Sequence, residues 1–294
     1  MISKHHEERD SGQALVIFAL SLIALIGFVA LVIDGGRAYA NRIKMQTAAD
    51  AAAVAGAIKL ADGAPTPVVV STAEQYAKDN GAVDVQITIE NDNIVHVRTS
   101  LNSPTFFAAA LGVNKVHATA EGAAKVEAVG AVGNLLPMAV YDQEFEYGET
   151  YELFNEKMEA PGAFGWLDWD GPPSPPPELA YRILHPGTSG VWHVGDWVRA
   201  APGLRPTPCV INALREWIGK EAIVPLYDSI TGMGCFTRYH ISSFAAFVIT
   251  DVEVHCGCGG PRFRVYGYFV RKVIEGASGG GTEDRGLRTV TLVQ

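Results

Sequence analysis

The residues best suited to covalent or metal chemistry are the four cysteines, Cys209, Cys235, Cys256 and Cys258. An even number of cysteines confined to one part of a chain predicts disulfides in an oxidising compartment, here with three connectivities. His255 and its two neighbouring cysteines could instead bind zinc, but structural zinc sites prefer Cys-x2–4-Cys pairs and this spacing is Cys-x-Cys. We therefore expect disulfides, with free thiols and a metal site as the alternatives, and no cofactor.

Nucleophilic catalysis would require a serine or cysteine beside a histidine. Cys235 with His240, or Ser242 with His240 and Asp251, supplies the residue types, but a triad is defined by geometry and not by nearness in sequence. The sequence contains no Walker A loop. The acidic run 142–152 is typical of a solvated face, with a calcium site as the alternative. We expect a non-enzymatic protein.

The first element of the chain is an apolar segment. Residues 14–33 carry no charge, and a helix of this length spans roughly 30 Å, the thickness of a bilayer's hydrocarbon core. A buried core helix would be amphipathic, and a signal peptide would have a shorter apolar stretch and a small-residue cleavage site. The segment therefore predicts a transmembrane anchor. The flanking lysines and arginines slightly favour a cytoplasmic location for the C-terminal side.

The helix is expected to continue past the membrane. Residues 37–60 contain no proline and are dominated by alanine, the best helix former, and Gly63 and Pro65 then end the helix. Small residues repeat at a spacing of four, which allows close approach of the chain's own globular part or of partner helices, although helix propensity alone is the alternative. The candidate packing residues are Ala48, Ala49, Ala52, Ala53 and Gly56, and the candidate membrane-boundary residues are Asp34 and Arg37.

Three motifs together resemble the N-terminal module of TadE/TadG-like Flp pilus-assembly proteins. They are Ser11-Gly12-Gln13, Asp34-Gly35-Gly36-Arg37 with Tyr39, and the run from Gln46 to Ala57. The resemblance covers about residues 10–60. It implies a bacterial single-pass protein with a short cytoplasmic N-terminus and an exported C-terminal part, and this orientation overrides the weak charge count. The implied partners are the lipid bilayer and other pilus-assembly membrane proteins, with an oligomer through the N-terminal helix as a further option.

Two features of such proteins are missing from this sequence. Class-IV prepilins are cleaved after a glycine and carry a glutamate at the fifth position of the mature chain, but after Gly12 that position is Ile17. TadG proteins often carry a von Willebrand-type domain with an Asp-x-Ser-x-Ser metal site, and no such pentapeptide occurs here. We therefore expect neither prepilin cleavage nor metal-dependent adhesion of that type.

The remainder predicts an α+β fold. A helix at 71–80 with Ser71 as N-cap, and alternating apolar residues on both sides of an Asn-Asp-Asn turn at 91–93, indicate a small α+β unit. A glycine-containing linker at 130–134 is followed by a tryptophan-rich part with several strand patterns and two short helical ones. The expected organisation is a cytoplasmic N-terminus (1–13), an anchor with its helical extension (14–62), an α+β unit (63–130), a β-rich exported domain (136–275), and a flexible tail with a candidate final strand (276–294).

Composition agrees with an anchored, otherwise soluble protein. The 294 residues are 48% hydrophobic and carry 23 basic against 32 acidic residues, a formal net charge of −9. The mean hydropathy of +0.12 is what one apolar segment on a soluble body produces. An acidic chain argues against nucleic acid as a partner. We therefore expect a non-enzymatic membrane component of a Tad/Flp-type pilus or secretion apparatus. The alternatives are an anchored exported hydrolase or binding domain, and a processed pilin-like subunit.

Overall fold

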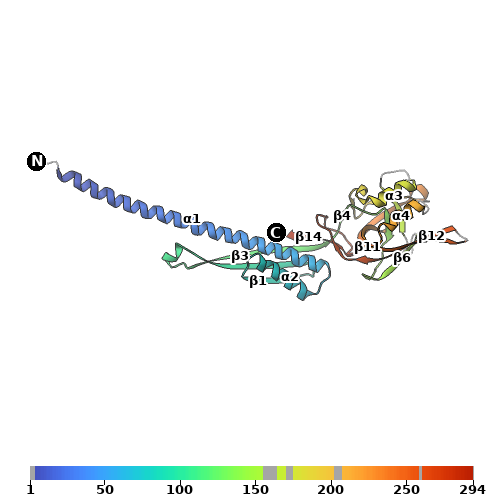
Figure 1. Cartoon of the computed structure of the whole chain (residues 1–294), viewed down its shortest axis with the longest axis horizontal. Coiled ribbons are helices and arrows are strands. Elements are labelled where there is room, and N and C mark those ends of the chain that lie inside the picture. Colours follow the sequence, from blue (N-terminus) through green and yellow to red (C-terminus); the bar gives the residue numbers. More distant parts are fainter. Residues whose placement is uncertain (1–3, 155–163, 170–174, 202–206, 258–259, 294) are drawn as a thin grey trace.

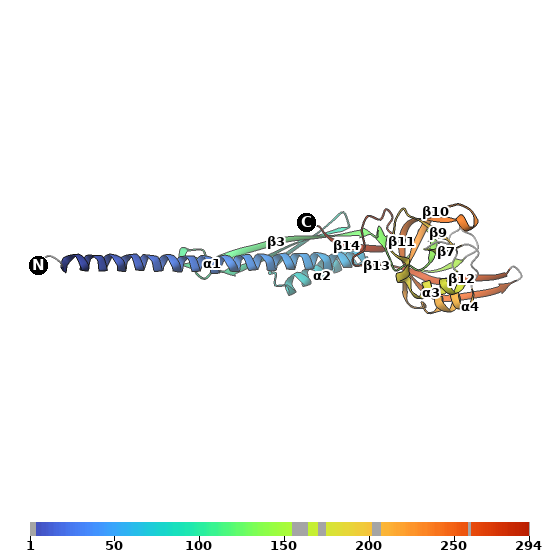
Figure 2. The same cartoon turned by 90° about the horizontal axis from the view of Figure 1, so that it is seen from above.

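A computed structural model describes residues 4–154, 164–169, 175–201, 207–257 and 260–293. The expected α+β fold is confirmed, because one long N-terminal helix is followed by a short helix and then by strand-rich sheets. The molecule is elongated: the helix and a slender sheet lie side by side, and a second β-rich body follows at the far end (Figure 1). Figure 2 shows the same arrangement from above.

The long helix α1 (Lys4–Ala61) contains the apolar segment and the alanine-rich segment without a break. No proline interrupts it before Pro65, and alanine has the highest helix propensity. The chain leaves the helix through Gly63, whose φ of +77° is a left-handed conformation that glycine adopts without strain.

The first body consists of α2 and the sheet that lies against α1. Helix α2 (Thr66–Asp79) starts earlier than expected, so Ser71 lies inside it and is not the N-cap. Its first turn contains Pro67, which tolerates that position because its missing N–H would have no partner there. Strands β1 (Asp84–Glu90) and β2 (Ile94–Pro104) form an antiparallel hairpin through the Asn-Asp-Asn turn. Strand β2 then pairs with β3 (Lys115–Ala128) across a loop that contains the short η1 helix (Ala108–Leu111).

The last strand of the chain belongs to this first sheet. Strand β14 (Leu287–Val293) pairs antiparallel with β3, and the short β13 (Lys272–Val273) pairs parallel with β14, so the sheet order is β1-β2-β3-β14-β13. The preceding segment, expected to be flexible, makes backbone hydrogen bonds with the end of β3: Gly130 N–H donates to Ser278 O and Gly281 N–H donates to Ala128 O. The C-terminal strand and a strand about 160 residues earlier in the sequence thus pair in one sheet.

The second body is built on a seven-stranded sheet in the order β10-β5-β7-β9-β11-β12-β6. Strand β10 also pairs with β11, so five of the strands close into a ring. The strands are β5 (Met138–Tyr141), β6 (Thr150–Phe154), β7 (Phe164–Asp168), β9 (Trp197–Ala200), β10 (Glu221–Thr231), β11 (Arg238–Gly257) and β12 (Gly260–Val270). The long β11 pairs with β9 and β10 through its first half and with β12 through its second half, and its pairing with β12 has a register shift between Ile249 and Asp251.

Two helices cover this sheet and complete its core. They are α3 (Pro176–Leu184) and α4 (Pro208–Arg215), with the short helices η2 (Pro186–Ser189) and η3 (Gly234–Phe236) in loops. Leu179, Ile183 and Leu214 of the helices are buried with Phe247 and Phe269 of the sheet. The expected linker at 130–134 includes β4 (Ala131–Val132), which is buried and pairs with β8 (Trp192–His193), so it joins the two bodies through hydrogen-bonded structure.

Candidate functional site: the apolar helix and the loop beside it

No residue of the apolar segment of α1, residues 14–33, is buried by the rest of the described chain. Its large side chains are exposed, among them Leu15, Phe18, Phe28 and Leu31, each with 68–72% of its surface accessible. Within the part of the chain that the structure describes, α1 is the one helix long and apolar enough to cross a membrane, and none of its most apolar window is buried. The core-helix alternative is therefore wrong, because a core helix would bury these side chains.

Asp34, the first charged residue after the apolar segment, binds the loop between β2 and β3. Its carboxylate accepts hydrogen bonds from the backbone N–H groups of Phe106 (3.0 Å), Phe107 (3.0 Å) and Ala108 (2.7 Å). These donors, first that of Phe106, lower the pKa of Asp34 below its ordinary value of 3.8. One helical turn further on, the Arg37 guanidinium carbon lies 4.4 Å from the centre of the Phe106 ring, a cation–π contact. The two candidate boundary residues therefore position one loop together.

Two further polar residues of α1 bind the edge of β3. Arg42 Nη1 donates to Thr119 O (3.0 Å) and Gln46 Nε2 donates to Glu121 O (2.9 Å). Residues four apart on a helix are separated by about 6 Å along its axis, and residues two apart on a strand by about 6.6 Å. The side chains of Arg42 and Gln46 are therefore spaced to reach alternate carbonyls of β3. This stretch of β3 lies beyond the end of β14, and α1 therefore supplies the donors that a neighbouring strand would supply.

The candidate packing residues all face the chain's own sheet and α2. Ala48, Ala49, Ala52, Ala53 and Gly56 are buried, the four alanines completely. A Cβ on Gly56 would lie 3.1 Å from Val95 Cγ1 and 3.2 Å from Ala73 Cβ. On the opposite side of the contact, a Cβ on Gly122 of β3 would lie 2.9 Å from the backbone of Ala49. The spacing allowed packing either against the chain's own globular part or against partner helices. The structure shows packing within the chain, and these residues are not exposed to a partner helix.

Residues 12–59 match the model of the family "Putative Flp pilus-assembly TadE/G-like". The resemblance noted from the motifs is thereby confirmed over this segment, which lies wholly within α1. Comparison with curated proteins and with solved structures gives no match.

Most of the contacts described above originate in the TadE/G-like segment. Asp34, Arg37, Arg42, Gln46 and Gly56 all lie inside residues 12–59, while their partners lie in α2, β2, β3 and the η1 loop, outside the match. The helix of this family segment is thus docked on a companion sheet by its own polar and small residues. Sequence reasoning found Asp34, Arg37 and the small residues but missed Arg42 and Gln46, whose i, i+4 spacing was the available signal.

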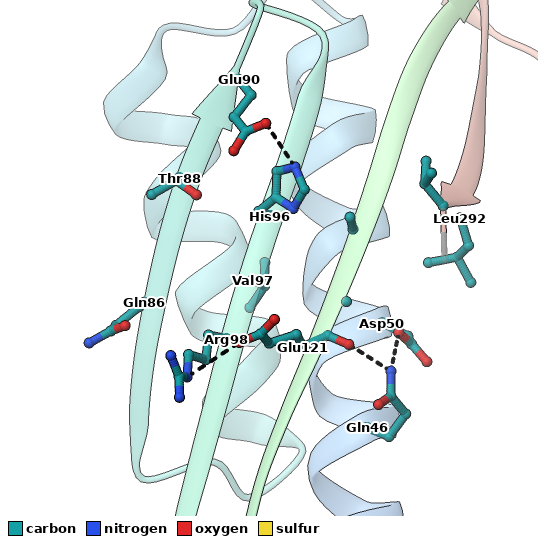
Figure 3. A pocket seen from close by; sticks show the side chains of 13 residues that line it. Gln46, Asp50, Gln86, Thr88, Glu90, His96, Val97, Arg98, Glu121 and Leu292 are labelled. Atoms are coloured by element: carbon teal, nitrogen blue, oxygen red, sulfur yellow. Dashed lines mark hydrogen bonds and ion pairs between the residues drawn. The ribbon is translucent and has the colours of Figure 1, made fainter.

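A groove of about 830 Å³ lies on the sheet next to the TadE/G-like segment (Figure 3). Gln46, whose side chain also donates to Asp50 Oδ1 (2.9 Å), lines one side of it. On the strands, His96 Nε2 lies 3.3 Å from Glu90 Oε2, and Arg98 Nε lies 3.5 Å from Glu121 Oε1. Both pairs are exposed, so each contributes little to stability. The groove is lined by Arg98 as well as by Asp50, Glu90 and Glu121, so its charge has no uniform sign.

The residues considered for catalysis or metal binding have other partners. Ser242 Oγ donates to Asp142 Oδ2 (2.6 Å), whereas His240 Nδ1 lies 2.8 Å from Asp228 Oδ1, so the Ser242–His240–Asp251 arrangement is not assembled. Asp142 itself is paired with Arg285 Nε (2.7 Å) from the C-terminal segment. Among the residues that the structure describes, no group of three or more His, Cys, Asp or Glu side chains is placed to hold a metal ion.

The expected disulfides are not supported. Cys209, on the first turn of α4, and Cys235, in η3, are both free and exposed. They belong to different surface elements, and Cys209 Sγ lies 3.1 Å from Thr207 Oγ1 instead. The side chain of Cys256 and the whole of Cys258 lie outside the described residues.

Proposed function

We propose that the protein is a non-enzymatic, single-pass membrane component of a bacterial Tad/Flp-type pilus assembly or secretion apparatus. The observation that carries this proposal is the combination of a TadE/G-like match over residues 12–59 with an apolar helix segment that the rest of the chain leaves uncovered. Uncovered apolar surface of this size is unfavourable in water and favourable in a bilayer.

In this proposal residues 14–33 cross the bilayer, residues 1–13 are cytoplasmic and the remainder is exported. The helix from Asp34 to Ala61 would extend about 40 Å from the membrane. Because it is docked on the first sheet over much of that length, it would act as a stalk that holds the β-rich body away from the bilayer (Figure 1). That body would present protein-binding surface to other pilus components.

An oligomer would have to use surface other than the small-residue face. The alanines and Gly56 are covered by the chain's own α2 and sheet, whereas the apolar segment and the side chains of Tyr39 and Ile43 remain exposed. We therefore assign contacts with partner helices in the membrane to residues 14–33. An acidic chain of this composition gives no reason to expect nucleic acid among the partners.

The proposal is tested by affinity purification of the full chain from detergent-solubilised membranes of its host, followed by identification of the co-purifying proteins. Pilus motor or platform proteins should be recovered with the wild-type chain. The variant Asp168→Ala destabilises the β-rich body. Partners that are lost with this variant contact the β-rich body, and partners that are still recovered contact the anchor. Recovery of a metabolic enzyme complex in place of pilus proteins would favour the anchored-hydrolase alternative.

A further inference from the structure

The loop between β2 and β3, residues 105–114, carries unusually exposed apolar side chains for a part of a folded sheet. Phe106 is 61% exposed, Phe107 is 41% exposed and Val113 is 50% exposed. Neighbouring apolar side chains on a soluble surface commonly mark an interaction site. The loop could have been folded back onto α1 to cover these side chains, but the structure holds it by its backbone and leaves them outside.

The hydrogen bonds to Asp34 determine where this loop lies along α1. Three consecutive N–H groups of the loop, from Phe106 to Ala108, donate to one carboxylate at 2.7–3.0 Å. Asp34 directly follows Ile33, the last residue of the uncharged apolar segment. The loop is therefore fixed at the level where that segment ends, and both figures that show the whole chain place the β2–β3 hairpin alongside α1 (Figures 1 and 2).

The charge around the loop suits a lipid surface. The chain has no aspartate or glutamate between Asp92 and Glu121, although it carries a net charge of −9 overall. Lys115 at the start of β3 is exposed, and Arg37 lies over the Phe106 ring. The Asp34 carboxylate, which lies against the loop, accepts hydrogen bonds from three of its backbone N–H groups. Basic groups beside exposed aromatic rings favour the headgroup region of a bilayer that contains anionic lipid.

From these observations we propose that the 105–114 loop is a second membrane contact, with Phe106, Phe107 and Val113 entering the boundary between headgroups and acyl chains of the leaflet in which the apolar segment ends. The proposal rests on residues 14–33 spanning the bilayer, because the loop reaches lipid only if Asp34 lies at the membrane surface. The occupant of this apolar surface is then the bilayer itself, which is continuous with the surface around the anchor.

The consequence is mechanical. A single helix can rotate and tilt in the bilayer, since its tilt is set by neighbouring helices and by interfacial anchors. A second contact, connected to the sheet through β2 and β3, would restrict both motions and fix the direction in which the stalk presents the β-rich body. Arg37 and Asp34 would serve as positioning residues for that contact.

The test is photo-crosslinking of the full chain in liposomes of phosphatidylethanolamine and phosphatidylglycerol. The photoreactive p-benzoylphenylalanine replaces Phe106, Phe107 or Val113 in separate variants, and lipid adducts are identified by mass spectrometry. The same group in place of Phe28, within the apolar segment, is the positive control. In place of Tyr76 it is the negative control, because Tyr76 is exposed on α2 and lines the same groove as Ala51, which lies about 25 Å along α1 from Asp34.

Lipid adducts at position 106 or 107 together with position 28, and none at 76, are the expected result. The proposal is overturned if position 28 reacts with lipid while positions 106, 107 and 113 all behave like position 76. If position 28 gives no lipid adduct either, the membrane anchor itself is wrong and the loop proposal falls with it. Using three loop positions guards against one substitution displacing the loop from Asp34.

Discussion

Replacing Gly56 tests whether α1 is docked on its own sheet as the structure shows. A Cβ at this position would lie 3.1 Å from Val95 Cγ1, 3.2 Å from Ala73 Cβ and 3.7 Å from Val69 Cγ1. Carbon atoms in favourable contact are about 3.5–4.0 Å apart, so even a methyl group forces its neighbours to move. A leucine would push its whole side chain into the same filled space, and such overpacking costs about 1–3 kcal/mol.

Gly36 provides the matched control because it lies in the same helix with no atom within 4 Å of its added Cβ. Replacing either glycine gains up to about 1 kcal/mol of helix propensity, so the comparison of the two variants isolates packing. We expect Gly56→Leu to lower the stability of the α1–α2–sheet unit by about 2 kcal/mol relative to Gly36→Leu.

Hydrogen exchange of the full chain in nanodiscs measures this difference locally. Amides of α2 and β2 report opening of the first body, and 2 kcal/mol corresponds to roughly 30-fold faster exchange. Amides of the β-rich body should exchange alike in both variants. Equal exchange of α2 and β2 in the two variants would refute the packing that we describe.

Three further predictions concern other parts of the molecule. The pKa of Asp34 is lowered from 3.8 in the folded state, so its carboxylate stabilises the loop fully above that pH. This stabilisation is lost as the pH falls through the lowered pKa. An acid-active protease should therefore cleave the loop faster in Asp34→Asn than in wild type at pH 5, and the difference should vanish at low pH. The buried Arg182 pairs with the buried Asp168 and with the half-exposed Glu178. Asp168→Ala should lower the free energy of unfolding of the β-rich body by about 3 kcal/mol, and Glu178→Ala by at most about 1 kcal/mol, as measured by urea titration of tryptophan fluorescence. Cys209 and Cys235 should both react with a maleimide in the folded, unreduced protein, and a mass spectrum that shows either in a disulfide would contradict the structure.

Local patterns predicted the elements of the first body well. The uncharged segment, the alanine-rich continuation and the turn at Asn91 and Asp92 each depend on properties of neighbouring residues, and both turn residues adopt the positive φ that such residues tolerate. Helix α2 starts at Thr66, before the expected Ser71, because Pro67 is tolerated in the first turn of a helix, where its missing N–H has no partner. The spacing of the small residues predicted a packing face but could not decide what covers it, since that depends on where β3 and α2 fold.

Long-range pairing was beyond what local patterns contain. The alternation near Thr289 indicated a strand, but nothing near it in the sequence indicates that β3 is its neighbour. The glycines at 279–281 look flexible by composition, yet they allow close backbone contact with the end of β3: a Cβ on Gly281 would lie 2.7 Å from Val129 O. The position of Asp34 after the apolar segment likewise predicts a membrane-boundary residue but not its three backbone donors, because these come from residues more than 70 positions away.

The most direct test of the proposed function is to delete the gene in its host and count surface pili by electron microscopy, with the wild-type chain or a variant supplied in trans. The proposal predicts that pili are lost on deletion, return with the wild-type chain and with Gly36→Leu, and do not return with a chain lacking residues 14–33. Normal pili in the deletion strain would contradict it.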